Sequence, residues 1–449
     1  MNAMLASLLI LVWAALCWTA WWRSRCGVSW IVSEMKSLGA QDASHLRCSD
    51  KLFVFLPALE EQSIVQDTLD HFSAVLAPFP NATIIVITGE SERARRDANN
   101  SSGELTSDVV DNWIARNGSG RVVRLHEPAL TGTKATKLQF AWRKLVERHG
   151  GDFVRRSWIA IYDFDSRPPP ETFVALAREI HIGRVDVVQQ VPHIAGSHMG
   201  QRPSASASCA QAVAHYERTL CIETDLRRRQ SGKLTWEIRY AMGAGLFLKA
   251  RCLDLTEGFP DYSDDIALGY RLDLLGVRRG VLPVPNFVQP APSFGAIVKQ
   301  YRRIYLGIFS VRREMHWFSK KSGGAVSAAM LLARMMVSNL RSFSNSIRFV
   351  IAVAAVLIAT QVSAGLAGAM LMTYVVGEFL AAFDSLRSMD KVRRSCGPGL
   401  GRLRQSVRGT LFSVFFQGVF PCLMLVDYIC HRAWWRYDAL KIAADKTPR

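Results

Sequence analysis

Short apolar runs alternate with stretches of helical spacing between residues 48 and 298. The runs of strand length are KLFVFLPA, ATIIVIT, RVVRL, SWIAIYDFD and VDVVQQV. Between them, stretches such as SIVQDTLDHFSAVL and ATKLQFAWRKLVERHG repeat apolar residues every three or four positions, the spacing of one helix face. Strands that alternate with helices form mainly parallel sheets covered on both faces. The pattern therefore predicts an α/β domain over residues 48–298.

The N-terminal stretch has a different pattern. Residues 1–22 contain no charged side chain and are long enough for one bilayer crossing. Arg23 and Arg25 follow the stretch, no charge precedes it, and no clear cleavage site is present. We therefore predict an uncleaved transmembrane anchor over residues 1–25 rather than a signal peptide. The positive-inside rule then places the following domain in the cytoplasm.

The chain becomes apolar again after the α/β domain. Residues 299–345 are predicted to form interfacial helices, because their apolar part carries Arg334 and a charge in the middle of a lipid-embedded helix is costly. Residues 346–430 are predicted to form transmembrane helices, and residues 431–449 a C-terminal tail. The chain is therefore predicted to be a multi-pass protein of a bacterial inner membrane or cell membrane.

The number of C-terminal crossings stays open between two and four. Residues 349–377 are free of charge, which fits either a hairpin that turns near QVSAG or one long tilted helix. A basic loop is predicted over residues 384–408 and placed in the cytoplasm, since residues 387–408 carry seven Lys and Arg.

The net charge of the chain indicates which kinds of partner it binds. The 449 residues include 55 Lys and Arg against 38 Asp and Glu, a net charge of +17, which indicates contact with nucleic acid or with an anionic membrane. The basic residues gather near the apolar stretches and no nucleic-acid motif is recognisable, so membrane lipids are the predicted partner and nucleic acid is not. Nine cysteines without metal-ligand spacing are predicted to be reduced thiols.

The clearest chemical signal follows the apolar run SWIAIY. Asp163 and Asp165 stand two positions apart, so they project to the same side at the end of a strand, and three prolines follow them. Two carboxylates held this closely need a cation or solvent. Taken alone, the pair fits a solvated acidic turn as well as a metal site.

Six motifs occur in a recognisable order over residues 51–305: FVFLPALEEQSIVQDTL, ATIIVITGESE, TGTKATKLQFAW, YDFDS, YAMGAGLFLKARCLDLTEGFPDYSDDIALGYRLDLLG and KQYRRIYLG. This order resembles glycosyltransferase family 2, in particular its membrane-embedded members related to cellulose, hyaluronan and chitin synthases. The resemblance implies a nucleotide-sugar-binding domain of the GT-A type. It also implies a nucleotide-sugar donor and a divalent cation, Mg²⁺ or Mn²⁺.

The resemblance assigns a donor side to the site. Four residues are implied to contact the nucleotide or its diphosphate: Pro57, Glu61, Thr88 and Lys134. Asp163 is implied to support the nucleotide, and Asp163 and Asp165 to hold the metal. Glu60 stands where the family usually has Asn, and Thr88 stands near the place of a base-contacting Asp. An acid at a helix start and an exposed lysine are the ordinary structural explanations for Glu61 and Lys134.

The acceptor side follows from the later motifs. Gly243 and Gly245 resemble the glycine pair that lets a sugar ring approach the backbone. Asp264 and Asp265 match the family's acid pair, and Asp265 is implied to be the general base of an inverting displacement. Helix capping is the alternative for both acids.

The last motif carries Gln300 and Arg303, implied to lie on the acceptor side, with Ile304 where processive synthases have Trp. A basic interfacial helix would give the same pattern.

The resemblance thus implies a membrane-bound inverting glycosyltransferase that adds sugar from a donor, with UDP-sugars favoured, to a growing poly- or oligosaccharide. Polysaccharide-export partners fit this function. Two alternatives stay open: transfer of a single sugar to a lipid-linked acceptor, and an inactive membrane scaffold for another synthase.

Overall fold

A computed structural model describes most of the chain between residues 50 and 430. The described ranges are 50–76, 79–100, 102–118, 120–194, 204–232, 238–261, 264–323, 328–361, 363–396 and 406–430, with Ser7, Leu11 and Ala14. The predicted tail over residues 431–449 lies outside these ranges, as does the predicted anchor over residues 1–25 apart from those three residues.

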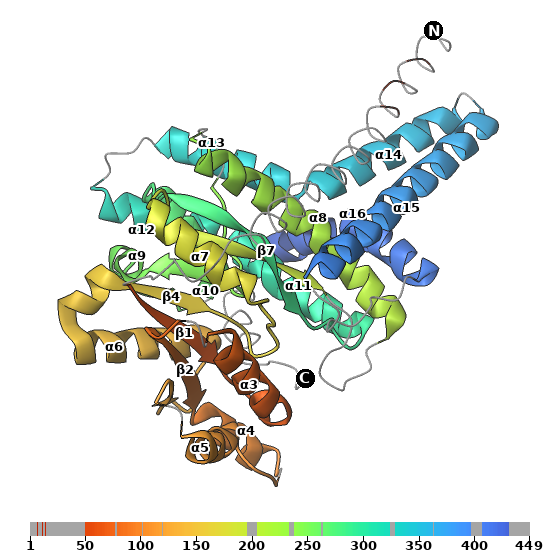
Figure 1. Ribbon diagram of the computed structural model, residues 1–449. Coiled ribbons are helices and arrows are strands. Elements are labelled where there is room, and N and C mark those ends of the chain that lie inside the picture. Colours follow the sequence, from red (N-terminus) through yellow and green to blue (C-terminus); the bar gives the residue numbers. More distant parts are fainter. Residues whose placement is uncertain are drawn as a thin grey trace.

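A seven-stranded sheet in the order β3-β2-β1-β4-β6-β5-β7 forms the centre of the molecule (Figure 1). Its strands are β1 Lys51–Pro57, β2 Ala82–Gly89, β3 Val122–Glu127, β4 Ser157–Ile161, β5 Val187–Ile194, β6 Leu246–Lys249 and β7 Arg279–Val288. The short strand β6 runs antiparallel to both of its neighbours, and all other pairs are parallel. The predicted α/β fold with a mainly parallel sheet is confirmed.

The described helices of this part of the chain, with one short 3-10 helix, are η2 Gln62–Ile64, α3 Val65–Val75, α4 Ser91–Ala98, α5 Thr106–Asn117, α6 Lys134–Arg156, α7 Glu171–Ile182, α8 Ala205–Gln230, α9 Ala250–Leu255 and α10 Asp264–Leu274. Side chains of β1 alternate between two cores. Leu52, Val54 and Leu56 pack with α3, α7 and α8, whereas Phe53 and Phe55 pack with α6, α9 and α10. A strand buried on both faces explains why its sequence reads as one continuous apolar run.

The strand order places a crevice in the sheet. The chain builds β1, β2 and β3 outward in one direction and then returns to place β4 on the other side of β1. Ligands of such sheets bind beyond the carboxyl ends of the strands at the point of reversal. The turn that follows β4, with Asp163 and Asp165, lies at this point.

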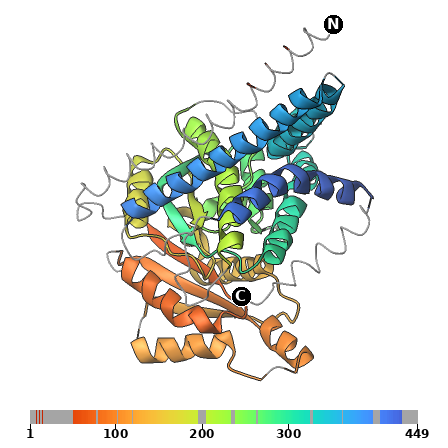
Figure 2. The ribbon, with the colours of Figure 1, turned by 90° about the vertical axis from the view of Figure 1, so that its right-hand side faces the viewer.

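In the described part of the chain after the last strand there are six helices: α11 Phe294–Phe309, α12 Val311–Lys321, α13 Ala328–Ser342, α14 Ser344–Thr360, α15 Ala364–Ser395 and α16 Val407–Cys430. Two of the described segments, Ala364–Arg394 and Val407–Asp427, are long and apolar enough to cross a membrane. Helices α14 and α15 lie side by side and project from the domain as a hairpin (Figures 1 and 2). The charge-free stretch 349–377 is therefore a hairpin, the first of the two alternatives.

Helix α15 extends further than the sequence pattern indicated. The predicted basic loop over residues 384–408 is helical as far as Ser395, and residues 397–405 lie outside the described ranges. The reason is a second apolar stripe: Leu386, Met389 and Val392, three positions apart, are buried in the core beside α7 and α8. The basic residues of this segment thus belong in part to a helix docked on the domain.

Candidate active site

A cavity of about 280 Å³ lies beyond the carboxyl ends of the central strands. Its walls come from the start of α6, the turn after β4, the ends of β5 and β7, the segment 240–244, and helices α8, α10 and α11. It brings together eight of the residues predicted from the sequence: Lys134, Asp163, Asp165, Gly243, Asp264, Asp265, Gln300 and Arg303. These residues span well over a hundred positions of sequence, so only the fold assembles them.

Four predicted residues do not line this cavity. Pro57 and Thr88 are buried at the ends of β1 and β2, and a hydrogen bond of 2.9 Å joins Thr88 Oγ1 to His126 Nδ1. Glu61 is buried, and its backbone N–H donates to Thr106 Oγ1 at 3.1 Å. Gly245 has a φ of +82°, and a Cβ there would lie 2.8 Å from Gln190 Cβ. Glycine is thus needed at this position for the backbone path.

The two acids after β4 lie in a turn. The strand ends at Ile161, and the N–H of Ser166 donates to the carbonyl of Asp163 at 3.0 Å. The acids therefore lie just beyond the strand, not on its last positions as the period-two alternation of strand side chains predicted. The guanidinium of Arg167 donates to the Ser166 carbonyl at 2.7 Å. Arg167 holds the turn together with the prolines, a role that was not predicted from the sequence.

Lys134 is the positive centre of the cavity. Its Nζ lies 2.9 Å from Asp163 Oδ1 and 3.4 Å from Asp264 Oδ2. Burial disfavours the charged amine, but the carboxylates of Asp163, Asp264 and Asp265 outweigh burial and raise the pKa of Lys134 above its usual value. The ammonium therefore stays charged at any physiological pH. It joins the acids after β4 to the acids of α10.

Asp265 is held by two backbone donors. The N–H of Gly243 donates to Oδ2 and the N–H of Ile266 to Oδ1, both at 2.8 Å. Burial and the neighbouring Asp264 raise the pKa of Asp265 to about 6, although Lys134 and the two N–H groups act in the opposite direction. An N-cap side chain accepts from a residue two or three positions further on. Asp265 instead accepts from its immediate neighbour and from a distant glycine.

Gly243 makes room for this arrangement. A Cβ at this position would lie 2.7 Å from Lys134 Nζ and 3.2 Å from Asp265 Oδ2. Any other residue would push these two groups apart. The glycine therefore lets the ammonium and the carboxylate meet at the backbone of the segment 240–244.

A second glycine sets the distance between α10 and this segment. A Cβ on Gly269 would lie 2.0 Å from the backbone nitrogen of Ala241. We expect Gly269→Ala to lower the free energy of unfolding by about 3 kcal/mol, the upper part of the usual range for overpacking, because backbone cannot move aside as a side chain can. Thermal unfolding of the purified protein measures this loss. Gly368→Ala, where a Cβ meets nothing within 4 Å, is the matched control and is expected to be neutral or stabilising.

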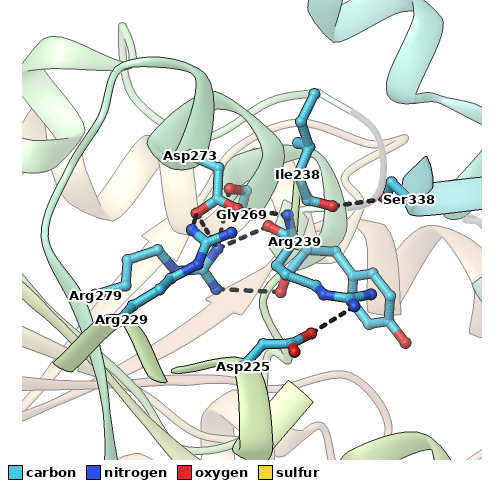
Figure 3. A network of polar contacts seen from close by, with 9 residues as sticks. Asp225, Arg229, Ile238, Arg239, Gly269, Asp273, Arg279 and Ser338 are labelled. Carbon is cyan, nitrogen blue, oxygen red and sulfur yellow. Dashed lines mark hydrogen bonds and ion pairs between the residues drawn. The ribbon is translucent and has the colours of Figure 1, made fainter. Parts of the chain in front are cut away.

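A buried ionic network fixes the start of the segment (Figure 3). Asp273 accepts hydrogen bonds from Arg229 at 2.7 Å, from Arg279 at 2.8 Å and from the backbone N–H of Arg239. Burial alone would raise the pKa of Asp273, but Arg279 and Arg229 lower it below its usual value. Asp225 pairs with the side chain of Arg239. Three arginines and two acids thus anchor this backbone.

Strand β7 and helix α13 each add hydrogen bonds to this backbone. Arg279 donates to the carbonyls of Arg239 at 2.7 Å and of Tyr240 at 3.1 Å. Ser338 on α13 donates to the carbonyl of Ile238 at 2.6 Å (Figure 3). Helix α13 is therefore bonded to the backbone two residues before the segment 240–244, which presents Gly243 to Asp265.

Two residues of α8 line the cavity and were missed from the sequence. Gln211 Nε2 donates to Gln300 Oε1 at 2.7 Å, and a hydrogen bond of 2.9 Å joins His215 Nε2 to the carbonyl of Pro192. Their spacing of four places both on one helix face. That spacing is too common in helices to mark a site by itself.

Helix α11 presents different residues to its two sides. Gln300, Arg303 and Ile304 line the cavity, whereas Tyr305 is buried against Phe343 and Phe420. Tyr305 therefore does not face the cavity. Ile304, which stands where processive synthases have Trp, does face it.

The acids after β4 fit a cation that is shared with a ligand. The described residues contain no group of three or more His, Cys, Asp or Glu that could hold a metal by itself. Mg²⁺ and similar cations are commonly held by one or two carboxylates together with phosphate oxygens of the substrate. Asp163 and Asp165 supply that number of carboxylates to one cavity.

The family comparison gives one match. Residues 158–376 match the model of the family described as glycosyl transferase family group 2. The matched stretch contains Asp163, Asp165, Gly243, Asp265 and Arg303, and begins after Lys134. No curated protein matches the chain.

Among solved structures, a mannosyltransferase from Pyrobaculum calidifontis in complex with GDP-Man and Mn²⁺ has 16% identity and a TM-score of 0.49, with 92% of this chain and 99% of that chain covered. TarS residues 1–349 from S. aureus have 13% identity and a TM-score of 0.38, and the match covers 77% of this chain and 90% of that chain. Glucosyl-3-phosphoglycerate synthase from Mycobacterium tuberculosis, in complex with Mn²⁺, UDP and glucosyl-3-phosphoglycerate, has 15% identity and a TM-score of 0.35, with 61% and 83% covered.

Proposed function

We propose that the chain is a membrane-bound inverting glycosyltransferase that transfers a sugar from a nucleotide-diphosphate donor to a saccharide acceptor. The observation that carries the proposal is one cavity in which Lys134, the acids after β4 and the held carboxylate of Asp265 meet. The match to the glycosyl transferase family group 2 model supports it. In this account Asp163, Asp165, Asp265 and Lys134 act directly on the substrates.

The charges of the cavity suit a diphosphate leaving group. A divalent cation, Mg²⁺ or Mn²⁺, would be held by Asp163 and Asp165 and would neutralise charge on the diphosphate as the sugar leaves. Lys134 adds a permanent positive charge beside it. Because Lys134 also contacts Asp264, the same ammonium orients the acids of α10 toward the donor.

Asp265 is proposed to be the general base. A sugar hydroxyl is a weak nucleophile, so a carboxylate must take its proton as the new bond forms. The bond from the acceptor oxygen to the anomeric carbon forms, the bond from that carbon to the diphosphate breaks, and the proton moves to Asp265. One displacement of this kind inverts the anomeric centre. A pKa of about 6 leaves Asp265 deprotonated at neutral pH yet basic enough to accept the proton.

Other predicted residues keep proposed supporting roles. Pro57, Glu61 and Thr88 lie at the carboxyl ends of β1 and β2, next to the crevice, and we assign them to the nucleoside half of the donor, with UDP-sugars favoured. Gln300 and Arg303 are assigned to the acceptor side, where α11 closes the cavity. The domain limits at residues 48 and 298 are part of the proposal.

Membrane location is supported by the C-terminal helices. Exposed large apolar side chains occur on α13, α14, α15 and α16, including Met336, Val350, Leu357, Leu371, Phe415 and Ile429. Soluble monomers rarely expose apolar patches of this extent. We propose a multi-pass protein with a cytoplasmic catalytic domain, in which α13 to α16 contact lipid.

Binding of nucleotides tests the metal assignment. We expect Mn²⁺ to tighten the binding of one of UDP, GDP or dTDP by about tenfold or more in the wild type, and Asp165→Asn to abolish this metal effect, since a carboxylate ligand is lost. Isothermal titration in nanodiscs, with Mn²⁺ or with a chelator, measures it. Asp152→Asn, an exposed acid at the end of α6, is the control and keeps the wild-type metal effect. Nucleotide binding that ignores the metal in the wild type would contradict the assignment.

A further inference from the structure

A buried glutamine on β5 bonds the backbone that leads to Gly243. The pairing of β5 with β6 ends at Gln189 and Leu246, and the chain just before Leu246 is irregular. Beyond this point the side chain of Gln189 replaces the backbone of β5 as a hydrogen-bond partner. Its Oε1 accepts from the N–H of Met242 at 3.0 Å, and its Nε2 donates to the carbonyl of Met242 at 3.2 Å. The amide thus bonds both backbone groups of one residue in the segment 240–244.

The other contacts of Gln189 fix which way its amide lies. Nε2 also donates to the carbonyls of Gln190 at 2.9 Å and of Gly245 at 3.2 Å. A flipped amide would place its oxygen against three carbonyl oxygens, which cannot donate a hydrogen bond. The side chain is only 1% exposed, and burial of an amide is unfavourable unless it is hydrogen-bonded. An apolar side chain of similar size would fill this position without that cost, so packing alone does not explain a glutamine here.

The carbonyl of Met242 and the N–H of Gly243 belong to the same peptide group. A trans peptide is planar, so its C=O and N–H point in opposite directions. Gln189 Nε2 lies on the carbonyl side, and Asp265 Oδ2 accepts from the N–H on the other side at 2.8 Å. A donor on the carbonyl also polarises the peptide and strengthens the hydrogen bond that its N–H makes. Gln189 is therefore linked to Asp265 through one rigid backbone unit.

Gln189 does not itself reach the cavity. It is not among the described residues that line the cavity, whereas Met242 and Gly243 are. The network in Figure 3 anchors the backbone before these two residues, and after them the N–H of Gly245 donates to the carbonyl of Ile161 at 2.9 Å. Gln189 bonds the stretch between the two anchors. Its effect on a reaction in the cavity must therefore pass through the backbone.

We propose that Gln189 is a positioning residue for the transfer, because it holds the peptide between Met242 and Gly243 so that its N–H bonds the carboxylate of Asp265. This inference rests on the proposed function, in which Asp265 is the general base. Burial and Asp264 raise the pKa of Asp265, and the N–H of Gly243 is one of the groups that oppose the rise. Weakening this hydrogen bond should therefore raise the pKa further.

A neutral substitution at Gln189 leaves the charges around Asp265 unchanged. The acidic and basic side chains that line the cavity with Asp265 are Lys134 from α6, Asp163 and Asp165 after β4, His215 from α8, Asp261 before α10, Asp264 from α10 and Arg303 from α11. None of these groups is altered when one uncharged side chain replaces another outside the cavity. A shift in the titration of Asp265 would therefore report the hydrogen bond from the backbone.

The pH profile of kcat/KM tests the inference. Release of nucleoside diphosphate by the full chain in native membranes is measured between pH 5 and 9, with Mn²⁺ and the donor that the wild type turns over. The wild type should have a midpoint at about pH 6. Gln189→Met keeps the approximate size of the side chain and removes its hydrogen bonds. We expect it to move the midpoint up by about 0.5 to 1 unit and to lower the plateau about tenfold or more. Mn²⁺-dependent nucleotide binding should be retained, since Lys134 and the acids after β4 are untouched.

Gln190→Met is the matched control from the same strand. Gln190 is also buried, and its amide accepts from Tyr162 Oη at 2.6 Å and donates to Thr172 Oγ1 at 2.7 Å. Neighbouring side chains of a strand point to opposite faces, so this amide lies away from the segment 240–244. The control is expected to keep the midpoint of the wild type. A midpoint that moves equally in both variants, or in neither, would overturn the role of Gln189 and leave glycosyl transfer standing.

Gln189→Asn is the second variant, in case Gln189→Met does not accumulate. It retains an uncharged amide that is one methylene too short to bond both backbone groups of Met242, and the same upward shift is expected. Failure of both Gln189 variants to fold, with Gln190→Met folded, would assign Gln189 to the fold alone and overturn the positioning role. Absence of turnover of every donor by the wild type would instead overturn the proposed function, and this inference with it.

Discussion

Replacing Asp265 by Asn is expected to lower kcat by about 10² to 10⁴-fold, the usual contribution of a general base. The amide cannot accept the proton of the acceptor hydroxyl. Its nitrogen would also face one of the two backbone N–H groups that now bond the carboxylate. Release of nucleoside diphosphate from the donor under saturating substrate measures kcat. Asp254→Asn, an exposed acid on α9, is the control and should retain wild-type turnover.

The pH dependence of the wild type follows from the same residue. Asp265 works as a base only when deprotonated, and its pKa is about 6. The rate should therefore be low below pH 5, rise through about pH 6 and level off above pH 7. A rate that is flat between pH 5 and 7, or a kcat that survives in Asp265→Asn, would assign the proton transfer to another group.

Replacing Asp273 by Ala is expected to cost about 3 to 5 kcal/mol of unfolding free energy, the usual effect of removing one partner from a buried ionic pair. Asp273 is buried with Arg279, and Arg229 donates to the same oxygen. The substitution leaves two guanidinium groups without this carboxylate. Because total stabilities are commonly 5 to 15 kcal/mol, the variant should melt far below the wild type or fail to accumulate.

The control for this prediction is an exposed ion pair. Arg124 Nε lies 2.6 Å from Asp111 Oδ1, but the Asp111 side chain is 51% exposed. Asp111→Asn should change the free energy of unfolding by no more than about 1 kcal/mol, because water and salt screen such pairs. Similar melting temperatures for Asp273→Ala and Asp111→Asn would show that the network in Figure 3 does not stabilise the fold.

Local sequence pattern predicted the sheet and part of the site. Five of the seven strands were predictable as short apolar runs, and the alternation of Phe53 and Val54 between two cores illustrates why a run buried on both faces is continuous. Strands β6 and β7 were not predicted. Asp163 and Asp165 were predictable as a pair because a turn keeps neighbours in sequence together in space. Lys134 and Asp265 were found through the order of the motifs, and the cavity brings both to the acids.

Long-range contacts could not be predicted in this way. Ser338 bonds the carbonyl of Ile238 across 100 positions, and Gln211 bonds Gln300 across 89. Neither residue type carries a pattern that identifies its partner. The helical end of α15 was missed for a related reason, since its apolar stripe is interleaved with the basic residues that suggested a loop.

The most direct test of the account is turnover of UDP-, GDP- and dTDP-sugars by the full chain in native membranes, with Mn²⁺ or a chelator, compared with Asp265→Asn. The account predicts metal-dependent release of one nucleoside diphosphate by the wild type and a loss of at least about a hundredfold in the variant. Nucleotide binding without turnover of any donor would contradict it, and would favour an inactive scaffold that keeps the fold and the cavity.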